Sequence, residues 1–190
     1  SGLALVARRG QLMDAACAAS HGAMAAVIGG EPAVIEGICR DAGIDVANYN
    51  CPGQIVISGL AERVDDAVAK LAEAGPRTVV RLNVAGAFHS RLMQPAADAF
   101  GAVLADTGIA VPVCPVVQNV VGAVVDDPAA IRQNLARQVT GSVQWEACVR
   151  AMLDTGIQAL VEFGPGKVLS GFMRRIDRKF PVCNIQSAED

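Results

Sequence analysis

The sequence predicts a protein of the α/β class, in which helices and strands alternate along the chain. Three observations support this. Several segments repeat apolar residues every three or four positions, short apolar runs of strand length lie between them, and Gly or Pro residues separate the two kinds of segment. Aromatic residues make up only 4% of the chain, so we expect a core built mainly from Ala, Val, Leu and Ile.

Residues 3–19 predict the first helix, because apolar residues such as Leu3, Val6 and Met13 recur at helical spacing. No strand or turn precedes this helix in the sequence. An apolar helix needs a surface to pack against. We therefore expect the chain to begin partway through a larger fold.

Residues 21–84 predict a compact unit of six elements. Its strands are expected at 22–29, 44–49, 54–58 and 78–82, and its helices at 31–42 and 61–74. Pro32 suits a first helical turn, and the turn-forming cluster at 50–53 joins the two middle strands. The order β-α-β-β-α-β is that of a ferredoxin-like unit.

The pattern changes after residue 84, where helices become more frequent. Helices are expected at 90–107, 128–139, 143–155 and 166–177, and strands at 112–117, 159–163 and 180–185. Strands alternating with helices favour one flank of a mostly parallel sheet covered on both faces. We therefore expect residues 1–20 and 85–190 to form a larger subdomain, into which the small unit 21–84 is inserted.

Composition excludes several classes of function. The chain of 190 residues is 52% hydrophobic and carries a formal charge of −3, which indicates a globular protein and argues against a nucleic-acid partner. No apolar run approaches the ~20 residues that span a bilayer, so we expect a cytoplasmic protein without a membrane partner. The six cysteines form no C-x-x-C pair, so no metal site is expected and most should be buried.

His89 is the stronger of the two histidines as a candidate for catalysis. His21 lies at a predicted helix end, whereas His89 follows a predicted strand, at a carboxyl end where α/β sheets gather ligands. Histidine can accept a proton near neutral pH, although a purely structural histidine remains an alternative. The chain contains no G-x-S-x-G nucleophile elbow, and Cys51 is a weak substitute, so the predicted base has no evident nucleophile.

Arg9 is a candidate for binding a carboxylate. Arg8 and Arg9 are neighbours in the first predicted helix, about 100° apart around its axis, so they cannot both face the core. A buried arginine needs a charged partner, and its planar fork can bind a carboxylate through two hydrogen bonds. The alternative is that both side chains are solvated. A phosphate site at Gly164-Pro165-Gly166 is poorly supported, because Lys167 alone does not complete a P-loop.

Seven segments, in order and spacing, resemble the malonyl-CoA:acyl-carrier-protein transacylases of fatty acid synthesis and the acyltransferase domains of polyketide synthases. The resemblance covers essentially the whole chain and rests on R-G-Q-L-M at 9–13, G-A-M-A-A-V at 22–27, N-Y-N-C-P-G-Q at 48–54, G-A-F-H-S at 86–90, R-Q at 137–138, V-Q-W at 143–145 and E-F-G-P-G at 162–166. It implies an α/β-hydrolase-like large subdomain with an inserted ferredoxin-like small subdomain.

The resemblance also implies a ping-pong transfer of malonyl from coenzyme A to the phosphopantetheine thiol of acyl carrier protein. His89 then corresponds to the general base, Gln138 to the residue whose main-chain carbonyl orients it, and Arg9 to the clamp on the malonyl carboxylate. Asn48 corresponds to a residue that lines the cleft, and Phe88 favours malonyl over methylmalonyl. Malonyl-CoA is a substrate and the carrier protein brings the phosphopantetheine, so no cofactor is implied.

One departure from the family pattern is serious. The family's serine, in a G-H-S-x-G segment, lies before the first helix of this chain, so we expect the missing N-terminal segment to be supplied in cis or as a separate chain. By itself the 190-residue chain is expected to form no acyl-enzyme. The alternatives are a fragment of a polyketide synthase acyltransferase domain and a non-catalytic remnant of the fold.

Overall fold

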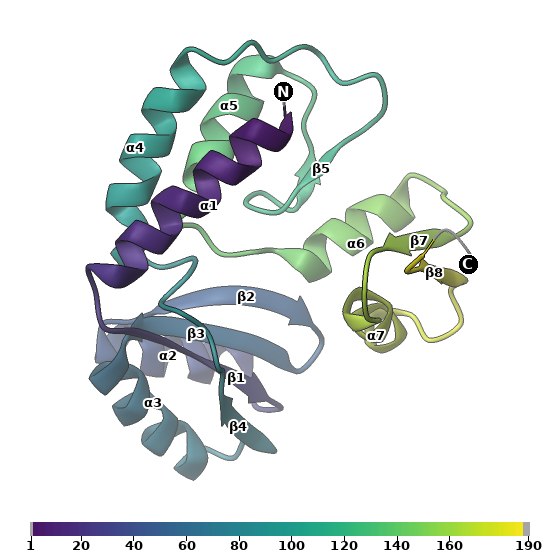
Figure 1. The fold of residues 1–190 in the computed structure, drawn as a ribbon. Coiled ribbons are helices and arrows are strands. Elements are labelled where there is room, and N and C mark those ends of the chain that lie inside the picture. Colours follow the sequence, from purple (N-terminus) through teal and green to yellow (C-terminus); the bar gives the residue numbers. More distant parts are fainter. Residues whose placement is uncertain (1, 188–190) are drawn as a thin grey trace.

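A computed structural model describes residues 2–187, which form a four-stranded sheet with two helices, a group of helices beside it, and a C-terminal group (Figure 1). The sheet unit contains β1 (Gly22–Ile28), α2 (Pro32–Ala42), β2 (Asp45–Cys51), β3 (Gln54–Leu60), α3 (Ala61–Glu73) and β4 (Thr78–Arg81). All its strand pairs are antiparallel and their spatial order is β2-β3-β1-β4. This is the ferredoxin-like arrangement that the element order predicts.

Local sequence explains where these elements begin and end. Pro32 occupies the first turn of α2, where its missing N–H removes no helical hydrogen bond. Gly43 ends α2 in the left-handed conformation, with φ of 67°, and its N–H bonds to the carbonyls of Arg40 and Cys39. Gly53 turns β2 into β3 with φ of 70°, a region that glycine enters without steric cost.

Both faces of the sheet are buried. In β1, successive side chains point alternately to one face and to the other. Ala23, Ala25 and Val27 face α2 and α3 and share their core with Ile57 and Leu71, which have no exposed surface. The intervening residues of β1 point to the opposite face. There Met24, Ala26, Ala47 and Val56 form a second cluster, against which Phe88 packs.

The second group places three helices side by side beside the sheet (Figure 1). It contains α1 (Gly2–Ala18), the short helix η1 (Arg91–Met93), α4 (Gln94–Ala105), the hairpin β5 (Val117–Gln118) and β6 (Ala123–Val124), and α5 (Pro128–Arg137). Its core joins Met13 and Cys17 of α1 to Met93, Phe100 and other buried residues of η1 and α4. Phe88 packs against this cluster too, so the residue before His89 joins two cores.

The C-terminal group contains α6 (Trp145–Asp154), β7 (Leu160–Phe163), α7 (Val168–Ile176) and β8 (Val182–Ile185). β7 and β8 pair in parallel, and α7 connects them. The Glu162 carboxylate accepts hydrogen bonds from the N–H groups of Leu169 and Ser170, which lie in the first turn of α7. The mixture of helices and sheets confirms the α/β class, and no helix between residues 2 and 187 has the length and apolar character to cross a membrane.

The structure corrects two sequence-based expectations about the second half of the chain. Residues 112–116 form no strand, and Val113 is fully exposed, because Pro112 and Pro115 cannot donate to a sheet. The helix expected at 90–107 is split into η1 and α4, with Pro95 in the first turn of α4. Parallel pairing within residues 2–187 joins β7 to β8, with a single further bridge between Asn48 and Val143, and this pair is consistent with one flank of a parallel sheet.

Candidate active site

His89 lies in the loop between β4 and η1, not at the end of a strand as the sequence suggested. Its φ of 55° makes it the one non-glycine residue with a positive φ in the described part of the chain. The next residue closes the turn: the Ser90 hydroxyl donates to the Ala87 carbonyl at 2.7 Å and accepts from the Leu92 N–H at 3.2 Å. The serine thereby fixes the backbone on both sides of His89.

Two glycines let this loop approach its neighbours closely. A Cβ built on Gly22 would lie 2.5 Å from the Ala87 nitrogen, and one built on Gly86 would lie 2.5 Å from the Cys17 Sγ. The first contact brings the loop against β1 and the second brings it against α1. Any larger side chain at either position would push the loop outward, so these glycines set the depth at which His89 sits.

Gln138, which follows α5, bonds to the His89 ring through its main chain. The His89 Nδ1 and the Gln138 carbonyl oxygen are 2.9 Å apart, and a carbonyl only accepts, so Nδ1 carries the proton. The neutral ring then presents an unprotonated Nε2. The Gln138 side chain donates to the Gly141 carbonyl at 2.9 Å, which braces the turn that holds the carbonyl in place.

The surroundings keep the His89 imidazole neutral. Burial is the largest influence and lowers the pKa of His89, and the nearby positive charge of Arg9 lowers it further. Hydrogen bonds to the carbonyls of Gln138 and Gly141 act in the opposite direction, but the net pKa remains below its ordinary value. A neutral imidazole with a free Nε2 can accept a proton at physiological pH.

Arg9 is half-buried on α1, whereas its neighbour Arg8 is exposed and hydrogen-bonds Gln11. Burial lowers the pKa of Arg9, and the ion pairs within residues 2–187 do not include it. The positive charge of Arg9 is one of the influences that lower the pKa of His89. The structure thus places Gln138 in hydrogen-bond contact with His89 and Arg9 within range of an electrostatic effect on it.

A cavity of about 330 Å³ opens beside His89. Its lining is formed by Asp45, Val46, His89, Arg91, Gln94, Thr140, Gly141 and Ser142. The other candidates are not among these residues. Phe88 packs into the two neighbouring cores, and Asn48 lies in β2, where it bridges to Val143.

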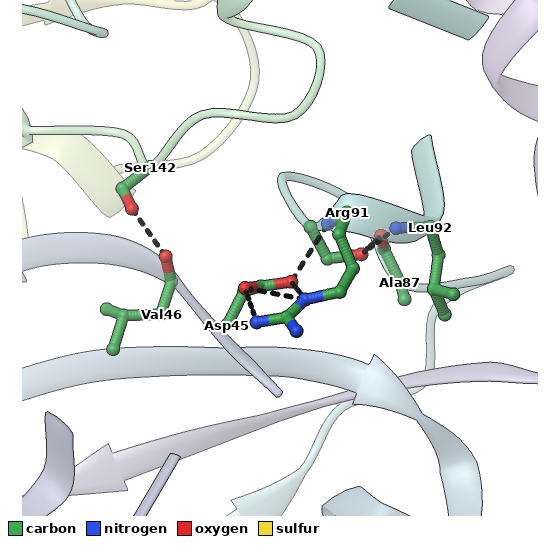
Figure 2. A network of polar contacts seen from close by, with 7 residues as sticks. Asp45, Val46, Ala87, Arg91, Leu92 and Ser142 are labelled. Carbon is green, nitrogen blue, oxygen red and sulfur yellow. Dashed lines mark hydrogen bonds and ion pairs between the residues drawn. The ribbon is translucent and has the colours of Figure 1, made fainter. Parts of the chain in front are cut away.

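Sequence reasoning did not single out Asp45 and Arg91, which form the main polar contact in the cavity lining. The Asp45 carboxylate accepts from the Arg91 backbone N–H at 2.8 Å and from its Nη2 at 2.7 Å, and it raises the pKa of Arg91 (Figure 2). The two residues are 46 positions apart in sequence, and no local pattern connects them.

Cys51, the substitute nucleophile considered from the sequence, is buried, and two serine hydroxyls are engaged in hydrogen bonds. Four of the six cysteines are buried, as expected, and burial raises the pKa of Cys51 as well as that of Cys148, the latter to about 11. The hydroxyls of Ser142 and Ser170 are bonded to Val46 and Glu162. No group of three or more His, Cys, Asp or Glu side chains suited to a metal ion is found among the described residues.

Comparison with known proteins gives a consistent result. Residues 1–185 match the model of a family described as "Acyl transferase domain". The malonyl CoA-acyl carrier protein transacylase of Bacillus subtilis is 35% identical over 189 residues, which is 97% of this chain and 60% of that protein. The chain thus spans about 60% of the length of the curated relatives it matches.

Solved structures agree in fold. The malonyl-CoA:acyl carrier protein transacylase of Xanthomonas oryzae is 47% identical with a TM-score of 0.92, covering 98% of this chain and 60% of that one. A malonyl-transacylase solved in complex with its type II polyketide synthase acyl-carrier protein is 34% identical, also with a TM-score of 0.92, covering 97% of this chain and 61% of that one.

Proposed function

The chain belongs to the acyl transferase domain family, and on that premise we propose that it carries the base and the carboxylate clamp of a malonyl transacylase. The reaction would move malonyl from coenzyme A to the phosphopantetheine thiol of acyl carrier protein in fatty acid biosynthesis. The nucleophile would be a serine in a G-H-S-x-G segment, which the 190 residues do not contain. Relatives with malonyl transacylase in their names support the substrate, and a complex with an acyl-carrier protein supports the partner.

His89 would act as the general base through Nε2. In the first half-reaction it takes the serine proton as the oxygen attacks the thioester carbonyl of malonyl-CoA, and it returns that proton to the departing coenzyme A sulfur. In the second half-reaction it takes the proton of the phosphopantetheine thiol and gives it to the serine oxygen. The Gln138 carbonyl supports both steps by fixing the proton on Nδ1.

Arg9 would bind the free carboxylate of the malonyl group. A half-buried guanidinium without a carboxylate partner among residues 2–187 is costly, and an anionic ligand would remove that cost. Two parallel N–H···O bonds to a carboxylate also select malonyl over acetyl groups. The selection of malonyl therefore depends on the positive charge of Arg9, which has no ion-pair partner among residues 2–187.

Phe88 and Asn48 do not line the cavity beside His89, and we propose that they shape the acyl site from neighbouring positions. Phe88 is held between two cores, so its position cannot relax to accommodate an added methyl group on the acyl chain. A methyl group is worth about 1–3 kcal/mol in discrimination, so methylmalonyl would be transferred more slowly and not excluded. Asn48 is held by the bridge of its strand to Val143, close to the turn that follows Gln138.

The observation that carries the proposal is the 2.9 Å contact between His89 and Gln138, with the Arg9 charge nearby. The test joins a G-H-S-x-G segment from a relative ahead of these residues and measures malonyl transfer to carrier protein by mass spectrometry. We expect transfer by the joined protein, loss of it in His89→Ala, and no malonyl adduct on the 190 residues alone. A stable joined protein without transfer would favour a non-catalytic remnant.

A polyketide pathway is the second candidate, because one similar structure pairs a malonyl-transacylase with a type II polyketide carrier. The chemistry of transfer is the same in both pathways. Offering the joined protein one carrier of each kind, at equal concentration, separates them by the ratio of kcat/KM values.

A further inference from the structure

The start of β2 is held against the loop that carries His89 (Figure 2). Arg91, two residues after His89, donates to the Asp45 carboxylate through its backbone N–H at 2.8 Å, its Nε at 3.0 Å and its Nη2 at 2.7 Å. A planar guanidinium fork combined with a backbone donor fixes both the side chain and the main chain of Arg91. The loop is therefore tied to Asp45 on the carboxyl side of His89.

The next residues of β2 hold the segment that follows Gln138. The Ser142 hydroxyl donates to the Val46 carbonyl at 2.5 Å, and the Val143 N–H donates to the Ala47 carbonyl at 2.8 Å. One residue pair of this strand, Asp45 and Val46, thus contacts both segments. Figure 2 shows Ser142 reaching Val46 on one side and Arg91 reaching Asp45 on the other.

We propose that Asp45 is a positioning residue for His89, and that Asp45 and Val46 together hold the His89 loop and the Gln138 turn at hydrogen-bonding distance from each other. The catalytic importance of these contacts rests on the proposed function, in which His89 is the base. The positioning itself rests only on the contacts of Asp45 and Val46. Asp45 touches no reacting group and acts through Arg91.

The backbone of His89 shows why such an anchor is needed. A histidine with φ of 55° occupies a sparsely populated region, which persists only when its surroundings impose it. Ser90 imposes it from within the loop, and Asp45 imposes it from the neighbouring strand. Without Asp45 the loop keeps its internal turn but loses its fixed distance from Gln138.

The alternative is an ordinary surface ion pair. The Arg91 side chain is 63% exposed and that of Asp45 is 26% exposed, and pairs of this kind contribute little to the free energy of unfolding. The two explanations differ in what happens at His89. The charged groups around its imidazole are Arg9 on α1, Asp45 on β2 and Arg91 on η1.

The test titrates the histidines of the 190-residue chain by NMR in Asp45→Asn and Arg91→Gln. If the pair acts only through charge, Asp45→Asn lowers the pKa of His89 and Arg91→Gln raises it. If Asp45 positions the loop, both variants weaken the hydrogen bond between the His89 Nδ1 and the Gln138 carbonyl, so the two pKa shifts have the same sign and the Nδ1–H signal is partly lost in both. Asp65→Asn, which breaks the exposed contact between Asp65 and Arg81, is the matched control and should leave His89 unchanged.

We expect a partial loss of the Nδ1–H signal in both variants, with shifts of the His89 pKa that have the same sign. His21, the second of the two histidines, is exposed and reports any disturbance of the whole fold. An unchanged Nδ1–H signal in Asp45→Asn, or pKa shifts of opposite sign in the two variants, overturns the proposal. If that variant does not fold, the largely exposed Arg91→Gln decides, because an unchanged Nδ1–H signal there also overturns it.

Activity gives a second measurement that keeps the two proposals apart. In the joined protein, both variants should lower kcat/KM by about tenfold to a hundredfold, and the acid limb of the pH profile should move in the same direction in both. Asp45→Glu should restore part of the rate, because it keeps the acceptor. An inactive parent protein with the expected NMR shifts refutes the transacylase function and leaves the positioning role supported, whereas unchanged kcat/KM in both variants refutes the positioning role.

Discussion

Gly86→Ala tests how closely the His89 loop packs against α1. A Cβ at this position would lie 2.5 Å from the Cys17 Sγ, 2.9 Å from its Cβ and 3.3 Å from its Cα. The φ of Gly86 is not among the positive values, so alanine fits the backbone and the whole cost comes from these contacts. Rotation of the Cys17 side chain can relieve the Sγ contact, but its Cβ moves only with the helix.

Overpacking of this kind costs about 1–3 kcal/mol, and each kcal/mol lowers the Tm of a chain of this size by about 2–4 °C. The assay is urea and thermal unfolding of Gly86→Ala beside Gly101→Ala. Gly101 lies within α4, and a Cβ at this position would have no heavy atom within 4 Å, so its replacement should stabilise the protein by about 0.5–1 kcal/mol.

A double variant makes the reasoning refutable. Cys17→Ala removes the Sγ at 2.5 Å and leaves the Cβ at 2.9 Å, so the destabilisation of Cys17→Ala with Gly86→Ala should be smaller than the sum of the two single changes. Strict additivity, or a Gly86→Ala protein as stable as the parent, would show that the loop does not press on α1.

Three further predictions concern the clamp, the base and the core. In the joined protein, Arg9→Gln removes about 1.5–3 kcal/mol of charged hydrogen bonding, so kcat/KM for malonyl-CoA should fall about ten- to a hundredfold, while slow transfer from acetyl-CoA should not fall. Equal losses for both substrates would contradict the clamp. Because the folded-state pKa of His89 is depressed, its contribution to stability is present above the unfolded value of about 6.5 and is lost as the pH falls below it. Urea unfolding at pH 7 and pH 5 should therefore show a smaller difference in His89→Gln than in the parent, and an equal difference would contradict the depressed pKa. Leu71→Ala, at a position with no exposed surface, should cost about 2–5 kcal/mol in thermal unfolding. Leu3→Ala, at an 81% exposed position, should change the stability by less than about 0.5 kcal/mol, and similar losses for both would contradict the described core.

The ferredoxin-like unit could be predicted because its signals are local. The amphipathic spacing of α3, the proline at the start of α2 and the turn at Gly53 each specify one element without reference to the rest. The antiparallel strand order then follows from the sequence of elements. Each predicted element of this unit is present, with ends that differ by one or two residues.

The segment at 112–117 shows where the same reasoning fails. Its valines favour a strand, but its two prolines, Pro112 and Pro115, do not. Each proline removes a backbone donor, so this stretch cannot pair along its length, and only Val117 enters the short β5. The composition of a segment indicates whether its residues favour a strand. A strand also requires backbone N–H donors that can pair with a neighbouring strand.

The candidate residues of the site could be proposed from the sequence, whereas the contacts that hold them could not. His89 could be singled out because histidines are scarce in this chain, Arg9 because an arginine in an apolar helix needs a charged partner, and Gln138 only from a resemblance in motif order. The positive φ of His89 and the contact between Asp45 and Arg91 depend on tertiary packing. This packing places the edge strand β2 against a loop 46 residues away in sequence. No periodicity or spacing in the sequence predicts that contact.

The choice of a main-chain carbonyl as the partner of His89 has a consequence for the proposed chemistry. A carboxylate at Nδ1 would fix the same tautomer but would raise the pKa of the imidazole strongly, whereas a neutral carbonyl fixes the tautomer at a smaller electrostatic effect. Arg9 then lowers the pKa of His89 as long as its charge is not neutralised. Under the proposed function, the malonyl carboxylate neutralises that charge, so the base gains affinity for a proton when the correct substrate binds. Arg9, as the proposed clamp, would thereby also adjust the pKa of the proposed base, which a clamp placed far from the base could not do.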